Sequence, residues 1–305
     1  MIDFTLLGTA ATMPLPDRAL SAAVLRCAGR TILFDCGEGT QTAARKAHVS
    51  LMKTDLIALT HYHGDHIFGL PGLMQSMNCL GRTEPLYITG PDGIEDGLAP
   101  ILALAGDLQY EVHLITGDVQ MSSLNASWPE TATLTHFPTE HRISSCGYAF
   151  SLPRPPKFLV DKAMALAIPQ KFWNRLQNGE TVTSGDAVFS PDMVAGKARR
   201  GLRIVFSGDT APCDNLLLAA KDADLLVCDA TYGESEQADL ARTYGHSTFE
   251  QTARLAAKAN VRRLWLTHYS QMIADPNDYF QSARDFFPDA ECGYDGKSVK
   301  LIFEE

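Results

Sequence analysis

Residues 59–73 read LTHYHGDHIFGLPGL, and within six positions the stretch holds four side chains that bind metal ions: His61, His63, Asp65 and His66. Imidazole nitrogens and carboxylate oxygens are ligands that zinc accepts without thiolates. The apolar run DLIALT at 55–60 predicts a buried strand directly before the motif. If the chain is still extended there, His61 and His63 point the same way, and Gly64 permits a sharp turn before Asp65. The stretch therefore predicts a metal site at the end of a strand.

Three further candidate ligands follow predicted strands: His141, Asp209 and His268. Loops beyond strand ends are where a rigid sheet holds functional side chains. We expect two ions at a separation of ~3.5–4 Å, with room for a water between them. The first ion would be bound by His61, His63 and His141, the second by Asp65, His66 and His268, with Asp209 bridging. Such ligands accept Zn²⁺, Mn²⁺ and Fe²⁺ alike, so the metal is not fixed by the sequence.

The composition is that of an ordinary globular protein, with 45% hydrophobic and 20% charged residues among 305. No apolar run reaches the length of about 18 residues that a transmembrane helix needs, and the N-terminus is not typical of a signal peptide. The seven cysteines are scattered without a C-x-x-C pair, which favours a reducing cytoplasm. The net charge of −10 argues against a polyanionic partner, unless basic residues are concentrated locally.

The order of predicted elements indicates sheets covered by helices on their outer faces. The first part reads mainly as strands, and the part after residue 200 alternates strand and helix. Residues 153–200 break this pattern, because they are rich in Pro and Gly. We interpret them as an arm inserted into a single domain spanning 1–305, although a long surface loop with a short helix is the alternative. The segment carries eight basic residues: Arg154, Lys157, Lys162, Lys171, Arg175, Lys197, Arg199 and Arg200.

The motif His-x-His-x-Asp-His with the later His, Asp and His resembles the metallo-β-lactamase superfamily. Further stretches, among them ILFDCGEGTQ, LTHYHGDHIFGLPGL, HRISSCGY, FSGDT, DATY and GHST, are similar to the ribonuclease Z branch along nearly the whole chain. The resemblance implies an α/β (α+β) fold, the αββα sandwich, with a dinuclear zinc site at the sheet edges. It also implies an endonuclease that matures the 3′ ends of precursor tRNA, a homodimer, and a flexible arm that grips the tRNA.

A mechanism consistent with this resemblance assigns three catalytic residues. Asp65 would act as general base towards the attacking water, and His246 in GHST, oriented by Asp229, would protonate the leaving 3′-oxygen. A role for Ser247 or Thr248 in capping the next helix is compatible with this role for His246. We also expect Asp35 either to hydrogen-bond a ligand histidine or to cap the following helix.

Two other functions stay open at this point. The stretch LAIPQKF lacks the Gly-Pro pair usual in the family's arm, and Asp229 stands where the family usually has Glu. These differences favour a hydrolase of the same fold that acts on a small phosphodiester, sulfate ester or lactone. An RNA-binding module without chemistry is the third alternative, and the complete set of seven ligands argues against it.

Overall fold

The computed structural model describes residues 1–185 and 187–304. Contacts divide the chain into two units, of which the first comprises residues 1–151 and 203–302. The second comprises residues 152–202 with the C-terminal residues 303 and 304, and so contains the whole segment 153–200. Among the described residues, none of the helices combines the length and the apolarity that crossing a bilayer requires.

The first unit begins with a seven-stranded sheet in the order β16-β1-β2-β3-β4-β5-β6. Strands β16, β1, β2 and β3 pair antiparallel, and β3, β4, β5 and β6 pair parallel. Most positions of β1 to β4 are buried on both faces, as their continuous apolar runs predict. The strands are β1 Ile2–Gly8, β2 Ala22–Cys27, β3 Arg30–Phe34, β4 Thr54–Ala58, β5 Leu86–Thr89, β6 Val112–Ile115 and β16 Ser298–Leu301.

A second seven-stranded sheet has the order β15-β14-β13-β12-β9-β8-β7. Its strands are β7 Val119–Gln120, β8 Thr133–Pro138, β9 Cys146–Arg154, β12 Arg199–Phe206, β13 Leu225–Asp229, β14 Leu264–Thr267 and β15 Ala290–Cys292. Aromatic side chains join the two sheets: the rings of Phe34 and Phe206 stack at 5.3 Å, and those of Phe4 and Trp265 meet edge to face at 6.2 Å. The inner faces of the sheets therefore form a sandwich core.

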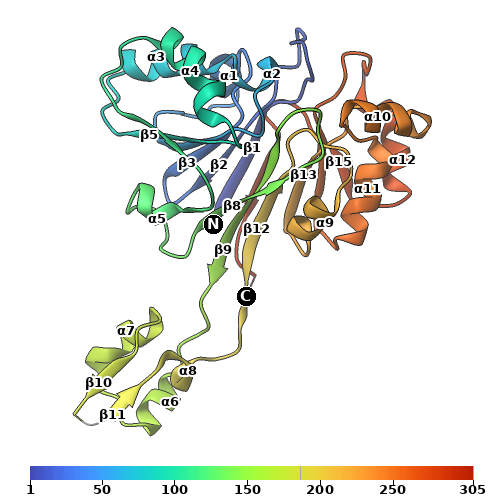
Figure 1. Cartoon of the computed structure of the whole chain (residues 1–305). Helices are drawn as coiled ribbons and strands as arrows, with labels where there is room; N and C mark the ends of the chain where they lie inside the picture. The colour runs from blue at the N-terminus through green and yellow to red at the C-terminus, as the bar shows by residue number, and fades with distance from the viewer. Residues whose placement is uncertain (186, 305) are drawn as a thin grey trace. The chain divides into compact units, whose positions relative to one another are not determined.

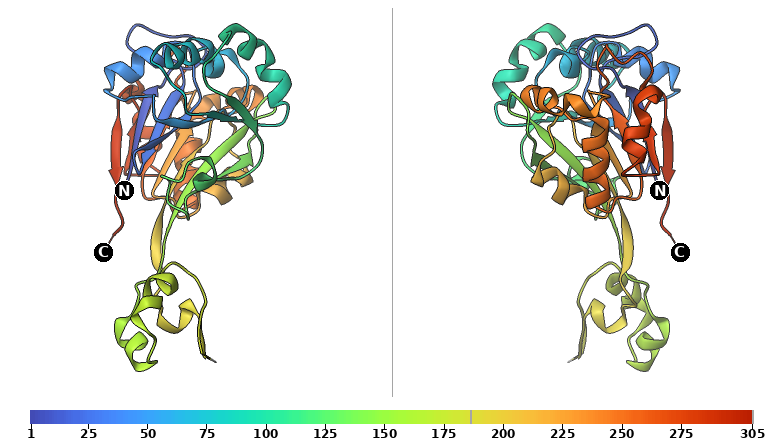
Figure 2. Two further views of the ribbon diagram at one scale, coloured as in Figure 1. Left: turned by 90° about the vertical axis from the view of Figure 1, so that its left-hand side faces the viewer. Right: turned by 90° about the vertical axis from the view of Figure 1, so that its right-hand side faces the viewer.

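Helices cover the outer face of each sheet (Figures 1 and 2). Against the first sheet pack α1 Thr40–Lys46, α3 Leu70–Cys79 and α4 Ile94–Ala105. Against the second pack α9 Asp214–Ala220, α11 Phe249–Lys258 and α12 Phe280–Arg284. Shorter helices complete the unit: α2 Gly64–Ile67, α5 Met121–Leu124, η2 Ser235–Gln237, α10 Ala238–Tyr244 and η3 Pro276–Tyr279. The order helix, sheet, sheet, helix is the sandwich that the sequence resemblance implies.

The second unit has secondary structure and a small apolar core of its own. It contains α6 Val160–Ala165, η1 Gln170–Phe172, α7 Trp173–Gln177, β10 Val182–Ser184, β11 Ala187–Phe189 and α8 Pro191–Val194. Its fully buried core consists of Ala163, Ile168, Leu176, Val182 and Val194. The alternative of a long loop with one short helix is therefore wrong, because five apolar side chains pack together and order the segment.

Candidate metal centre

The histidine motif follows β4 of the first sheet. His61 is fully buried in the connection after Ala58, and His63 is the extended residue before α2. Asp65 and His66 lie within the single turn of α2, so all four motif side chains come from one short corner. Asp209 follows β12 and His268 follows β14 in the second sheet, and His141 lies between β8 and β9. The expected positions after strands therefore hold.

One group of ring nitrogens gathers on the side of the motif. His61 Nε2 lies 3.0 Å from His63 Nδ1, and His141 Nε2 lies 3.2 Å from the same Nδ1. Asp209 Oδ2 is 3.6 Å from His61 Nε2. These four residues each offer one ligand atom, and all four atoms lie within 4.8 Å of one another.

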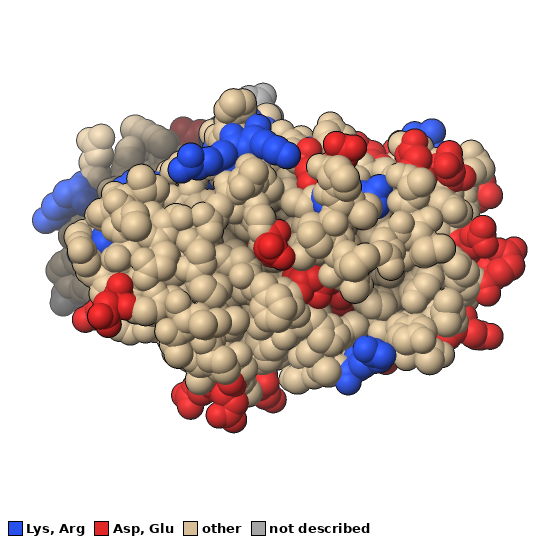
Figure 3. All heavy atoms as spheres, turned by 90° about the horizontal axis from the view of Figure 1, so that it is seen from above, with Lys and Arg blue, Asp and Glu red and all other residues tan. Residues whose placement is uncertain are grey.

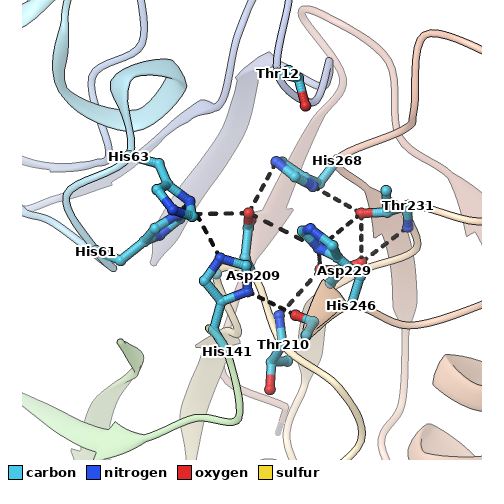
Figure 4. Close-up of polar contacts among 12 residues, drawn as sticks. Thr12, His61, His63, His141, Asp209, Thr210, Asp229, Thr231, His246 and His268 are labelled. Carbon is cyan, nitrogen blue, oxygen red and sulfur yellow. Dashed lines mark hydrogen bonds and ion pairs between the residues drawn. The ribbon is translucent and has the colours of Figure 1, made fainter. Parts of the chain in front are cut away.

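A second group lies on the other side of Asp209. His66 Nε2 is 3.3 Å from His268 Nε2, and Asp65 Oδ2 is 3.6 Å from both nitrogens. Asp209 reaches this group too, with Oδ1 at 3.4 Å from His66 Nε2 and Oδ2 at 3.2 Å from His268 Nε2. Figure 4 shows Asp209 between the side chains of His61, His63 and His141 and those of His246 and His268.

These residues fit metal ions better than they fit one another. Two imidazole nitrogens that face each other at about 3 Å can share only one proton. Several nitrogen lone pairs of the cluster therefore point at one another with too few N–H donors between them. Asp209 Oδ1 is buried and accepts no hydrogen bond from the described residues. Buried polar atoms without a partner are rare, and an ion that accepts several such ligands removes the anomaly. The chemistry of the donor set is that of a metal-binding cluster.

In four of the clustered histidines, the ring nitrogen that faces away from the cluster has a partner of its own. Such contacts fix the tautomer and the ring orientation of a metal ligand. The contacts are Thr60 Oγ1 with His61 at 3.0 Å, Asp35 Oδ2 with His66 at 2.8 Å, the Gly245 carbonyl with His141 at 2.8 Å and Thr231 Oγ1 with His268 at 2.9 Å. The first of the two roles expected for Asp35 is thus confirmed, and α1, which begins at Thr40, has no side-chain cap.

His246 lies beside the cluster and faces a carboxylate. Its Nδ1 is 2.7 Å from Asp229 Oδ2, and Asp229 itself is fully buried at the end of β13. Asp229 also accepts from the backbone N–H groups of Thr210 and Thr231, at 3.1 and 2.9 Å. Thr248 caps α11 by accepting from the Gln251 N–H at 3.2 Å, so His246 is positioned just before a capped helix.

Comparison with known proteins now decides the family. The ribonuclease Z of Agathobacter rectalis is 39% identical to this chain over 306 residues, which cover all of both proteins. The chain belongs to the ribonuclease Z family. The crystal structure of human tRNase Z, short form (ELAC1), matches with a TM-score of 0.67 and 28% identity over 99% of this chain and 100% of that one.

Further matches support the fold of this ribonuclease Z family member. The metallo-β-lactamase fold protein YhfI from Bacillus subtilis superimposes with a TM-score of 0.68 over 98% of each chain, at 18% identity. A family model described as beta-lactamase superfamily domain matches residues 186–269, and one described as anti-Pycsar protein Apyc1 matches residues 2–201. The metallo-β-lactamase sandwich expected from the sequence is therefore confirmed.

Burial and neighbouring charges shift the pKa values of the candidate ligands. Burial is the main cause that lowers the pKa of His61, so this ring stays in the neutral form that a metal ligand requires. For Asp209, burial alone would raise the pKa, but neighbouring positive charge, that of His268 first and then that of His66, outweighs burial and lowers the pKa well below its ordinary value. Burial likewise opposes the charge on His66, yet Asp209 and Asp35 raise its pKa well above the ordinary value. Metal binding at this centre must therefore displace a proton.

Some residues of the site carry no signal in the sequence. Thr231 contacts Asp229, His246 and His268 with one hydroxyl, and the backbone N–H of Thr12 donates to Asp65 Oδ2 at 2.7 Å. For Thr231, the one hint in the sequence is its position two residues after Asp229, where β13 ends. Nothing in the stretch around Thr12 distinguishes it from an ordinary loop.

Proposed function

We propose that this chain is a metal-dependent endoribonuclease that removes the 3′ trailer of precursor tRNA. The observation that carries the proposal is the convergence of two His/Asp groups on Asp209, in a chain aligned from end to end with ribonucleases Z. The seven ligands expected from the sequence supply both groups: His61, His63 and His141 for one ion, Asp65, His66 and His268 for the other, and Asp209 between them. We further propose that both ions are Zn²⁺.

The residues of the chain divide the remaining work. When bound, two divalent cations lower the pKa of a water towards 7 and offset negative charge on the phosphate oxygens. Asp65 accepts the proton of the attacking water: it lines the cavity above the cluster, and the Thr12 N–H at 2.7 Å holds its Oδ2 in place. Attack forms a bond from the water oxygen to phosphorus, and the bond from phosphorus to the 3′-oxygen breaks.

His246 and Asp229 serve the leaving group. Burial opposes a charge on His246, but the Asp229 carboxylate at 2.7 Å outweighs it and raises the pKa of His246 to about 9. The ring therefore carries a proton at neutral pH and can give it to the departing 3′-oxygen. Asp229 keeps its place through bonds from three backbone N–H groups, those of Thr210, Thr231 and Ser247, so the shorter side chain in place of the family's usual Glu still reaches His246.

The second unit is proposed to bind the body of the RNA. The side chains of Lys157, Lys162, Lys171 and Lys197 are exposed on it, in a protein that is acidic overall. Lysines on a surface neutralise phosphates, and their contribution weakens as salt rises. A homodimer is proposed from the family resemblance, and the exposed Leu80 and Leu104 at the packed helices α3 and α4 offer it an apolar contact. We also propose a cytoplasmic location.

Two substrates test the proposal in parallel. Purified protein is incubated with a precursor tRNA that carries a 3′ trailer and with bis-p-nitrophenyl phosphate, and the RNA products are mapped to the nucleotide. A single cut at the trailer boundary, abolished by Asp209→Ala, supports the proposal. Hydrolysis of the small ester without any cut in the RNA would instead assign the centre to a small-ester hydrolase. Changing Lys157, Lys162 and Lys171 to Gln should raise the KM for RNA and leave ester hydrolysis unchanged.

A further inference from the structure

The cavity above the metal-binding cluster is aromatic at its rim rather than cationic. It has a volume of about 530 Å³, and Asp65, His63 and His268 are among the residues that line it. Phe68, Tyr232 and Tyr244 line the same cavity, and Arg142 is its single Lys or Arg among the described residues. Looking down on the face that carries α2, Figure 3 shows acidic side chains near the centre and Lys and Arg in separate small groups away from it. Lys and Arg side chains therefore offer few phosphate contacts around this cavity.

Phe68 presents an aromatic face to solvent on one side of this cavity. Its side chain is 64% exposed, which is unusual for a phenylalanine in the first turn after a metal motif. The ring lies against Gly64: a Cβ atom at Gly64 would come within 2.3 Å of Phe68 Cε2. Gly64 separates His63 from Asp65, so the ring lies directly beside the corner that carries the candidate ligands.

Tyr244 presents a second aromatic face, together with Arg142. Tyr244 is 42% exposed, and the Arg142 guanidinium lies 5.4 Å from its ring centroid. The next residue, Gly245, accepts the His141 Nδ1 hydrogen bond at 2.8 Å, and a Cβ atom there would come within 2.8 Å of His141 Cα. Tyr244 is thus attached to the cluster as closely as Phe68 is, but through a different element, the end of α10.

We propose that Phe68 and the Tyr244–Arg142 pair stack the unpaired bases next to the scissile phosphate. The inference rests on the proposed function and specifies its substrate: the bases beside the cut must be single-stranded, since a base within a duplex has no free face. Stacking on an aromatic ring tolerates any base, so the site selects unpaired nucleotides and not a sequence. Exposed rings fixed to both sides of the ligand cluster are the arrangement that this recognition requires.

The test combines protein variants with substrates that lack single bases. The kcat/KM of wild type, Phe68→Ala and Tyr244→Ala is measured on a precursor RNA and on the same RNA with an abasic nucleotide immediately before or after the cut. Each variant should lose about 5- to 150-fold on the intact RNA, the range for one stacked base. The loss should disappear on the RNA whose missing base is the one that the ring stacks. Phe68→Trp should restore cleavage, and Phe68→Leu should not.

Tyr294→Ala is the matched control, because Tyr294 is 62% exposed and lines a different cavity. It should cleave every RNA like wild type. Losses of equal size on intact and abasic RNA would overturn the stacking inference, since displacement of the ligands in α2 would affect all substrates alike. A wild-type protein that hydrolyses bis-p-nitrophenyl phosphate but cuts no RNA would overturn the proposed function itself.

Discussion

Removing one hydroxyl, in Thr231→Val, should weaken metal binding without touching a ligand. Thr231 Oγ1 lies 2.9 Å from both Asp229 Oδ1 and His268 Nδ1, and the residue is 5% exposed. An ionised carboxylate can only accept, so the Thr231 hydroxyl donates to Asp229 and accepts the Nδ1–H of His268. That bond leaves the lone pair of His268 on Nε2, the atom that faces His66 and Asp209.

The expected size follows from the burial of this contact. Valine offers no acceptor, and water has little access, so the N–H of His268 stays unpaired at a cost of about 1–3 kcal/mol. Loss of such a supporting contact typically weakens metal affinity about 10–100-fold, which is the same range of free energy. Affinity is measured by competition of the zinc-loaded protein with a chromogenic chelator, and the number of ions per chain is measured separately.

Two variants control for other effects of this substitution. Thr231→Ser keeps the hydroxyl and should bind metal like wild type. Thr40→Val removes a buried hydroxyl that donates to the Gly37 carbonyl at 2.7 Å, and it should lower stability without changing metal affinity. The reasoning fails if Thr231→Val binds metal as tightly as Thr231→Ser does.

Three further changes separate chemistry, core and arm. His246→Ala should keep the metal content of wild type while cleavage falls about 10²–10⁴-fold, the usual contribution of a positioned proton donor; unchanged kcat would remove His246 from the mechanism. Asp55→Ala should lower the free energy of unfolding in urea by about 3 kcal/mol, because Trp128 Nε1, 2.7 Å from Asp55 Oδ2, loses its acceptor and Arg30, 5% exposed, is left with Glu84 as its ion-pair partner; a change below 1 kcal/mol would contradict this. Leu176→Ala removes a buried side chain from the small core of the second unit, a loss of about 2–5 kcal/mol, so limited proteolysis should cut first within 152–202 while the metal content is retained; new cuts elsewhere would argue against a separate core.

The sequence by itself determined the architecture and named the residues that meet in the candidate metal centre. Continuous apolar runs such as DLIALT form buried strands. Successive side chains of a strand point to opposite faces of the sheet, so such a run makes both faces apolar, and both must be covered. The density of ligand-type residues at 61–66 identified the centre, since such residues rarely occur so close together without a cation. Candidate ligands after other strand ends could be named because sheets bring the ends of their strands to one edge.

Only the tertiary structure decided how these groups act on one another. Thr231 contacts His268 across a separation of 37 positions in the sequence, and the Gly245 carbonyl contacts His141 across 104 positions. No local sequence pattern encodes such contacts. The same holds for Asp229, whose side chain reaches His246 because three backbone N–H groups fix it. The exposed faces of Phe68 and Tyr244 in one cavity follow from the approach of α2 and α10, since burial and proximity depend on the packing of distant elements and not on the residues alone.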